Sequence, residues 1–215
     1  MLLAEGGGME INMGIFITVE GPNGVGKSTF IKRLEQTLSL QHIVFLTKEP
    51  SDSNFGKYVK ENEEVLSGEA YAYLIAADRC YHIKEYIEPA LDKGKIVISD
   101  RYIESSFVLQ EYDGVKIEDI WRLNCKFRVP DLSIILLGAE ETLENRLSER
   151  SKLTHFETKM TRRDEIEGYI RAANYLKNKG FNIIMLYNNT ELEMKNNLNK
   201  VKEIIFNIYR SRRNG

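Results

Sequence analysis

The segment from Glu20 to Phe30 has a spacing of residues that can bind a row of phosphate groups. Its core reads GPNGVGKS and satisfies the pattern G-x-x-x-x-G-K-S. Glycines let backbone N–H groups turn toward an anion, the lysine reaches the β- and γ-phosphates of a nucleotide, and the serine hydroxyl can ligate Mg²⁺. We therefore predict that Lys27 and Ser28 bind ATP and Mg²⁺. The expected ATP-binding residues are Gly21, Pro22, Asn23, Gly24, Val25, Gly26, Lys27, Ser28 and Thr29.

A second pair of residues with possible chemistry, Asp100 and Arg101, follows the apolar run at 95–99. The carboxyl end of a strand is where an open parallel sheet places its ligands, so Asp100 can help Ser28 to hold Mg²⁺. Arg101 offers a planar fork that binds phosphate, and this phosphate would not belong to ATP. The alternative is an ordinary surface ion pair after a strand. On the first interpretation, Lys27, Asp100 and Arg101 are catalytic candidates.

Five short apolar runs must position these residues. The runs alternate with segments of helical spacing, which predicts a parallel sheet covered on both faces. We expect an α/β, three-layer fold of the P-loop kinase type with a five-stranded parallel sheet. The expected strands are 15–19, 43–47, 95–100, 132–137 and 182–186, and a long helical stretch is expected over 69–91.

Length and composition favour one domain. We expect a flexible leader at 1–14, a kinase domain at 15–212 and a short lid at about 149–163. The net charge of −2, from 30 basic and 32 acidic residues, favours neither nucleic acid nor a membrane surface as a partner. No run approaches the roughly 20 apolar residues of a membrane span. With two widely spaced cysteines, these features predict a cytoplasmic protein.

Three classes of protein share the phosphate-loop pattern. Transport-type ATPases would need more than the faint signature at 66–69, LSGE, and an apolar strand ending in Asp-Glu should follow it closely. GTPases would need a guanine-reading Asn/Thr-Lys-x-Asp, which the sequence lacks. Small-molecule kinases remain.

The chain resembles the thymidylate kinase family, which phosphorylates dTMP with ATP. The resemblance extends from Phe16 to about Tyr187. Its motifs are GPNGVGKS, TKEP (47–50), FGKYVK (55–60), AADR (76–79), and DRYIESS (100–106) with Gln110.

The resemblance implies roles for residues that the spacing alone does not assign. Arg101 and Lys60 would bind the acceptor phosphate, and Arg79 would hydrogen-bond the base. Arg150, in the lid, would neutralise the phosphate during transfer. The implied acceptor-binding set is Glu49, Lys60, Ile75, Arg79, Arg101, Ser106, Leu109 and Gln110. Two simpler interpretations stay open: Arg79 extends to water beside an apolar helix face, and the lid arginines are solvated surface charges.

Departures from the family pattern cluster on the acceptor side. Ile75 stands in place of a stacking Phe, Leu109 in place of an aromatic residue, and Asn23 in place of an acid. We expect ATP-dependent phosphorylation of a nucleoside monophosphate, with dTMP as the first choice of acceptor, by a Mg²⁺-dependent homodimer. The alternatives are a kinase for another nucleotide or nucleoside, and a non-catalytic nucleotide-binding relative.

Overall fold

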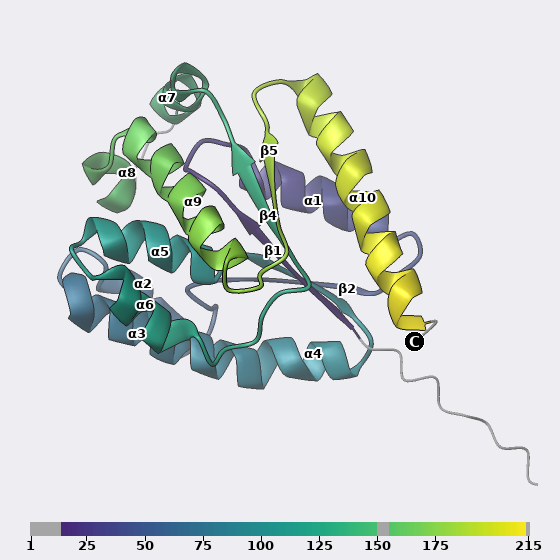
Figure 1. Ribbon diagram of the computed structural model, residues 1–215, viewed down its shortest axis with the longest axis horizontal. Coiled ribbons are helices and arrows are strands. Elements are labelled where there is room, and N and C mark those ends of the chain that lie inside the picture. The colour runs from purple at the N-terminus through teal and green to yellow at the C-terminus, as the bar shows by residue number, and fades with distance from the viewer. Residues whose placement is uncertain (1–13, 150–154, 214–215) are drawn as a thin grey trace, which may run out of the picture.

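The computed structural model describes residues 14–149 and 155–213. In this part of the chain five strands form a parallel sheet in the order β2-β3-β1-β4-β5 (Figure 1). The strands are β1 (Ile15–Glu20), β2 (Val44–Lys48), β3 (Ile96–Asp100), β4 (Leu132–Leu137) and β5 (Ile183–Tyr187). The fold class and the five predicted strands are confirmed, with ends shifted by at most one residue.

Helices cover both faces of the sheet (Figure 1). Helices α1 (Lys27–Leu38) and α10 (Glu191–Arg213) pack on one face. The other face carries α3 (Gly68–His82), α5 (Ile103–Tyr112), α6 (Ile117–Asn124) and α9 (Arg162–Lys177). The remaining helices are α2 (Asn54–Glu61), α4 (Glu88–Asp92), α7 (Glu140–Ser148) and α8 (His155–Lys159).

The strands explain this three-layer arrangement, because their side chains alternate between two hydrophobic cores. In β1, Ile15, Ile17 and Val19 face α1 and α10, whereas Phe16 joins the core beneath α3, α5 and α9. All four side chains are fully buried. An uninterrupted apolar strand is stable only where both faces of the sheet are covered.

The long helical stretch predicted over 69–91 is built from three segments. Helix α3 passes into a π-helical turn, η1 (Ile83–Ile87), and then into α4. Pro89 follows the π-helical turn directly, and because proline has no N–H to donate, the helix lacks one backbone hydrogen bond at this irregular place. Gly94 adopts a positive φ and turns the chain into β3.

The parallel register of β1 and β3 brings the phosphate loop and the Asp100–Arg101 segment together. Val19 of β1 is paired with Asp100 of β3, so the phosphate loop and Arg101 emerge side by side. The backbone N–H of Glu49 donates to the carbonyl of Asp100 at 3.0 Å, which adds the end of β2 to the same edge.

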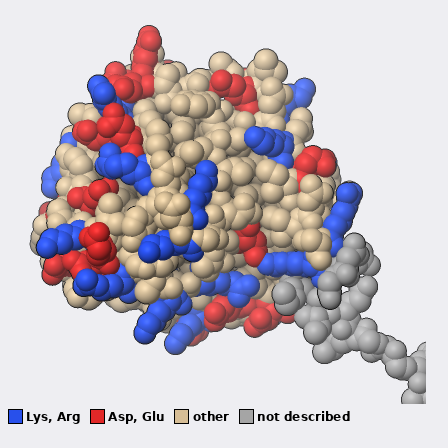
Figure 2. Space-filling view, in the orientation of Figure 1, with Lys and Arg blue, Asp and Glu red and all other residues tan. Residues whose placement is uncertain are grey.

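Acidic and basic side chains are interspersed on the face of the molecule shown in Figure 2. Among the described residues, no helix has the length and apolar character needed to cross a membrane. Residues 1–13 of the predicted leader and residues 150–154 of the predicted lid lie outside the described residues, so the predicted domain limits stay predictions.

We predict that Leu34→Ala destabilises the fold, because Leu34 is fully buried between α1 and the sheet. The free energy of unfolding should fall by about 2–5 kcal/mol. Leu40, which is 83% exposed, provides the matched control. Leu40→Ala should change the free energy of unfolding by less than about 0.5 kcal/mol. Urea denaturation measures both, and equal losses would contradict the assigned core.

Candidate functional site

The glycine-rich segment between β1 and α1 has the conformation that a phosphate loop requires. Gly21, Gly24 and Gly26 have φ values of 137°, 82° and 94°, which side chains with a Cβ rarely adopt. At Gly21 a Cβ would also lie 2.2 Å from the carbonyl oxygen of Leu136. Helix α1 begins at Lys27, so its N-terminal N–H groups and dipole face the loop and favour an anion there.

Lys27 lies folded back onto the loop. Its Nζ donates to the carbonyl oxygens of Gly21 and Pro22 at 2.7 and 3.0 Å. Burial, followed by repulsion from Arg101, lowers the pKa of Lys27 to about 7. The two hydrogen bonds hold Nζ within reach of any phosphate that enters the loop, and the negative charge of that phosphate would favour the protonated form of Lys27.

Asp100 and Ser28 line the same cavity and offer oxygen ligands for a metal ion. Asp100 Oδ1 is buried without a hydrogen-bond partner among the described residues, so it remains available. Mg²⁺ is typically bound by one or two protein oxygens together with substrate phosphates and water. The pair fits that requirement, although within residues 14–149 and 155–213 no cluster of three or more acidic, His or Cys side chains forms a closed metal site.

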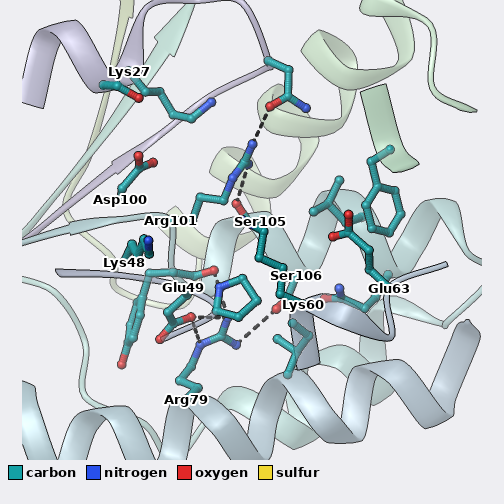
Figure 3. Close-up of a pocket in the computed structure, with 18 of the residues that line it drawn as sticks. Lys27, Lys48, Glu49, Lys60, Glu63, Arg79, Asp100, Arg101, Ser105 and Ser106 are labelled. Atoms are coloured by element: carbon teal, nitrogen blue, oxygen red, sulfur yellow. Dashed lines mark hydrogen bonds and ion pairs between the residues drawn. The ribbon is translucent and has the colours of Figure 1, made fainter. Parts of the chain in front are cut away.

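One cavity of about 460 Å³ joins the loop to the segments that the sequence assigned to the acceptor. In Figure 3, Lys27 and Asp100 lie at one end, Glu49, Ser106 and Arg79 lie at the other, and Arg101 lies between them. The predicted residues that line it are Asn23, Gly24, Gly26, Lys27, Ser28, Thr29, Glu49, Lys60, Ile75, Arg79, Asp100, Arg101, Ser106, Leu109 and Gln110. Gly21, Pro22 and Val25 support the loop from outside the cavity lining, and Arg150 lies outside the described residues.

Arg101 is held in a left-handed backbone conformation, with φ at 72°, which is unusual for a residue other than glycine. The Ser99 hydroxyl donates to the Arg101 carbonyl at 2.7 Å and secures this turn. The guanidinium donates to Tyr169 Oη at 2.7 Å and to Asn23 Oδ1 at 2.7 Å. Strained backbone of this kind is a marker of functional sites, and here it directs Arg101 into the cavity.

Glu20, the last residue of β1, supports this turn from below. Its fully buried carboxylate accepts the backbone N–H of Tyr102 at 2.5 Å and the Ser105 hydroxyl at 2.7 Å. Ser105 Oγ in turn accepts a hydrogen bond from Arg101 at 3.1 Å. The sequence analysis missed Glu20, although an acidic residue closing an apolar strand is a signal that could have identified it.

Arg79 is buried in α3, with 1% of its surface exposed, so the interpretation that it extends to water is wrong. Every N–H of its guanidinium has a protein acceptor. Nε and Nη2 pair with Glu49 Oε2 at 2.8 and 2.7 Å, and Nη2 also donates to the carbonyl of Tyr102. Nη1 donates to Ser106 Oγ at 3.1 Å and to Asn124 Oδ1.

Glu49 also faces a residue that the sequence analysis did not assign. The Nδ1 atom of buried His82 lies 3.3 Å from Glu49 Oε1, and its Nε2 lies 2.5 Å from the Thr47 hydroxyl. His82 and Asn124 were not predicted, because their partners are remote in sequence.

The predicted base-binding residues gather around the far end of the cavity. Ser106 and Gln110 are buried on α5, and Ile75 and Leu109 are half-buried apolar walls. Gln110 Oε1 has no hydrogen-bond partner among the described residues, so it can accept a donor from a ligand. Lys60, at the last turn of α2, is exposed at the rim.

The basic residues near the lid have structural partners. Arg146 donates to backbone carbonyls of the phosphate loop and of the segment after β5, including Val25 at 3.2 Å and Asn189 at 2.7 Å. Arg163 pairs with Glu167 on the surface of α9 at 2.9 Å. Arg162 is buried beside Glu165, at 2.9 Å.

Comparisons with known proteins agree with this geometry. The thymidylate kinase family profile matches residues 19–209. A probable thymidylate kinase of Caldivirga maquilingensis is 41% identical over 75% of this chain and 82% of its own length. One from Pyrococcus abyssi is 38% identical over 76% and 82%, and a thymidylate kinase of Leifsonia xyli is 34% identical over 74% and 80%.

Glu104 is a fully buried residue in the first turn of α5. We predict that Glu104→Gln removes a pH-dependent loss of stability. Burial, followed by the proximity of Glu20, raises the pKa of Glu104 from 4.5 to about 8. A raised pKa stabilises the fold below the unfolded value, and this contribution is lost as pH rises from about 4.5 to about 8. The loss is at most about 1.4 kcal/mol per pH unit.

Urea denaturation at pH 5.5, 7 and 8.5 tests this effect. The stability of Glu104→Gln relative to the wild type should increase with pH. Glu118, exposed on α6, gives the control variant Glu118→Gln, whose offset from the wild type should be flat. A flat offset for Glu104→Gln as well would contradict the prediction.

Proposed function

Because the chain belongs to the thymidylate kinase family, we propose that it transfers the γ-phosphate of ATP to dTMP, giving ADP and dTDP. The observation that carries the proposal is one continuous cavity. The phosphate loop lies at one end, and the other end is a slot lined by the apolar residues Ile75 and Leu109 and the polar residues Arg79 and Gln110. Arg101 lies between them, where an acceptor phosphate would meet the donor. A cavity of this kind supports transfer between two bound nucleotides rather than to water.

On the donor side, Lys27 and the N-terminus of α1 bind the phosphates of ATP. Lys27 exchanges the carbonyls of Gly21 and Pro22 for phosphate oxygens as the nucleotide enters. Ser28 and Asp100 would hold Mg²⁺, which would neutralise negative charge on the phosphates of ATP. Phosphoryl transfer needs alignment and positive charge more than covalent chemistry, and these residues supply both.

On the acceptor side, Arg101 binds the phosphate of dTMP. Its guanidinium is fixed by Tyr169 and Asn23, so little conformational entropy is lost on binding. Lys60 adds a flexible positive charge at the rim, and Arg150 of the predicted lid would add another.

The base is recognised at the far end of the slot. Gln110 Oε1 accepts the N3–H of thymine, since it has no other partner in the described part of the chain. Arg79 can donate to a base carbonyl only by giving up an existing contact, and Ser106 Oγ, 3.1 Å away, is the simplest one to exchange. Ile75 and Leu109 cover the ring and the sugar, while Glu49 keeps Arg79 in place.

The family resemblance also supports a homodimer, and the composition supports a cytoplasmic location. We therefore propose a cytoplasmic homodimer, with a leader at 1–14 and one kinase domain at 15–212. Light scattering on the purified chain measures the first of these directly.

The test of the function is ADP release in a coupled assay with Mg²⁺ and a panel of acceptors: dTMP, dUMP, UMP, CMP, AMP, GMP and thymidine. We expect dTMP to have the highest kcat/KM. Activity on thymidine but on no monophosphate would overturn the proposal. Nucleotide binding without ADP release would indicate a non-catalytic relative instead.

We predict that Arg101→Ala separates the two substrates. The KM for dTMP should rise by ~10-fold or more, because a charge-assisted contact is lost, while the KM for ATP should change less than about threefold. Arg122, exposed on α6 and paired only locally with Asp119, gives a control variant, Arg122→Ala, that should match the wild type. Equal losses for dTMP and ATP would contradict the role of Arg101.

A further inference from the structure

Helix α9 contacts the phosphate loop through a buried carboxylate that the proposed reaction has not used. Glu165 is 1% exposed and lies in the first turn of α9. Its Oε1 accepts two hydrogen bonds from Asn23, from the backbone N–H at 2.9 Å and from the side-chain Nδ2 at 3.0 Å. Its Oε2 pairs with Arg162 at 2.9 Å.

Asn23 connects this carboxylate to the acceptor arginine. Its Nδ2 faces Glu165, and its Oδ1 accepts from Arg101 Nη2 at 2.7 Å. A side chain at this place must donate on one side and accept on the other. An amide does both, whereas a carboxylate would accept on both sides and would stand beside a second carboxylate.

Glu165 therefore determines which way the Asn23 amide points. With the carboxylate in place, the amide nitrogen is held toward α9 and the amide oxygen toward Arg101. Rotating the amide by half a turn would place Nδ2 against a guanidinium and Oδ1 against a carboxylate, and both contacts would be lost.

We propose that Glu165 is a positioning residue for the transfer reaction: it fixes the Asn23 amide, and Asn23 Oδ1 aims the guanidinium of Arg101 at the acceptor phosphate. This inference rests on the proposed function, in which Arg101 binds that phosphate. Glu165 does not itself line the cavity, so it acts through Asn23 and touches no substrate.

The ionic surroundings favour this arrangement. The charged and titratable groups that face Glu165 are Lys27 from α1, Arg101 from the turn after β3, and Arg162 and Tyr169 from α9. Arg101 and Arg162 carry permanent positive charge, which attracts the carboxylate and keeps it in place as the acceptor for Asn23.

The test compares Glu165→Gln, Asn23→Asp and the double variant Asn23→Asp/Glu165→Gln with the wild type. Glu165→Gln should lower kcat/KM for dTMP by ~10-fold or more and change the KM for ATP less than about twofold. Glu167→Gln is the matched control, because Glu167 lies on the same helix and pairs with an arginine at the same 2.9 Å, but on the surface. It should leave all parameters unchanged.

Asn23→Asp adds a pH signature that a purely structural role would not produce. At pH 8 two carboxylates face each other and activity on dTMP should fall by ~10-fold or more. It should recover as the pH falls toward 6, because a proton shared between the two groups restores one donor. Because Lys27, with a pKa of about 7, titrates in both proteins, the quantity to compare is the activity of Asn23→Asp relative to the wild type, and this ratio should rise as the pH falls.

The double variant completes the cycle. In it, the amide introduced on α9 can donate to the carboxylate introduced in the loop, so the double variant should be more active at pH 8 than Asn23→Asp alone. A double variant no more active than Asn23→Asp, or full activity of Asn23→Asp at pH 8, would overturn the proposal. A wild type inactive on dTMP would instead overturn the proposed function. Thermal melting of each variant distinguishes a loss of folding stability from a loss of the correct Arg101 orientation.

Discussion

The site depends on one constraint, the burial of the Glu20 carboxylate at the point where β1 and β3 end side by side. A buried carboxylate is costly unless its oxygens are satisfied, and Glu20 is satisfied by Tyr102 N–H and the Ser105 hydroxyl. Those two donors come from the turn after β3 and from the first turn of α5, so the chain must fold back over Glu20. That path forces Arg101 into its left-handed conformation. The pairing of β1 with β3 places Glu20 beside the turn, and the hydrogen bonds of Glu20 then determine the position of Arg101.

A buried ion pair, Glu49 with Arg79, organises the opposite end of the cavity. Arg79 is saturated by protein acceptors, and His82 stands behind Glu49. Breaking such a pair would leave an uncompensated charge in the interior, so the two residues are conformationally fixed. The slot for the base therefore has a rigid floor, whereas its walls, Ile75 and Leu109, are apolar and adaptable.

Local signals account for what the sequence predicted. Apolar runs and the glycine spacing place the strands and the phosphate loop, because burial on both faces and positive φ each demand particular residues. The cavity residues were predicted through motifs that keep their spacing, such as DRYIESS. Pairings across long separations were not: Asn23 with Glu165, Arg79 with Asn124, and Glu49 with His82 join elements whose contact depends on how helices pack on the sheet. In each pair one residue belongs to a recognisable motif, but its partner (Glu165, Asn124 or His82) has no distinctive signal in the sequence.

The position of Lys27 changes how affinity for a nucleotide should be understood. Before any nucleotide binds, the Lys27 side chain already forms hydrogen bonds with two backbone carbonyls of the loop. Occupation by phosphate is therefore an exchange, and the measured affinity is a difference between two satisfied states. A chain that held its lysine more tightly would have a better ordered loop and a weaker grip on ATP. The same carbonyls would accept the Lys27 side chain again as the phosphates leave, which would lower the free-energy cost of releasing the nucleotide.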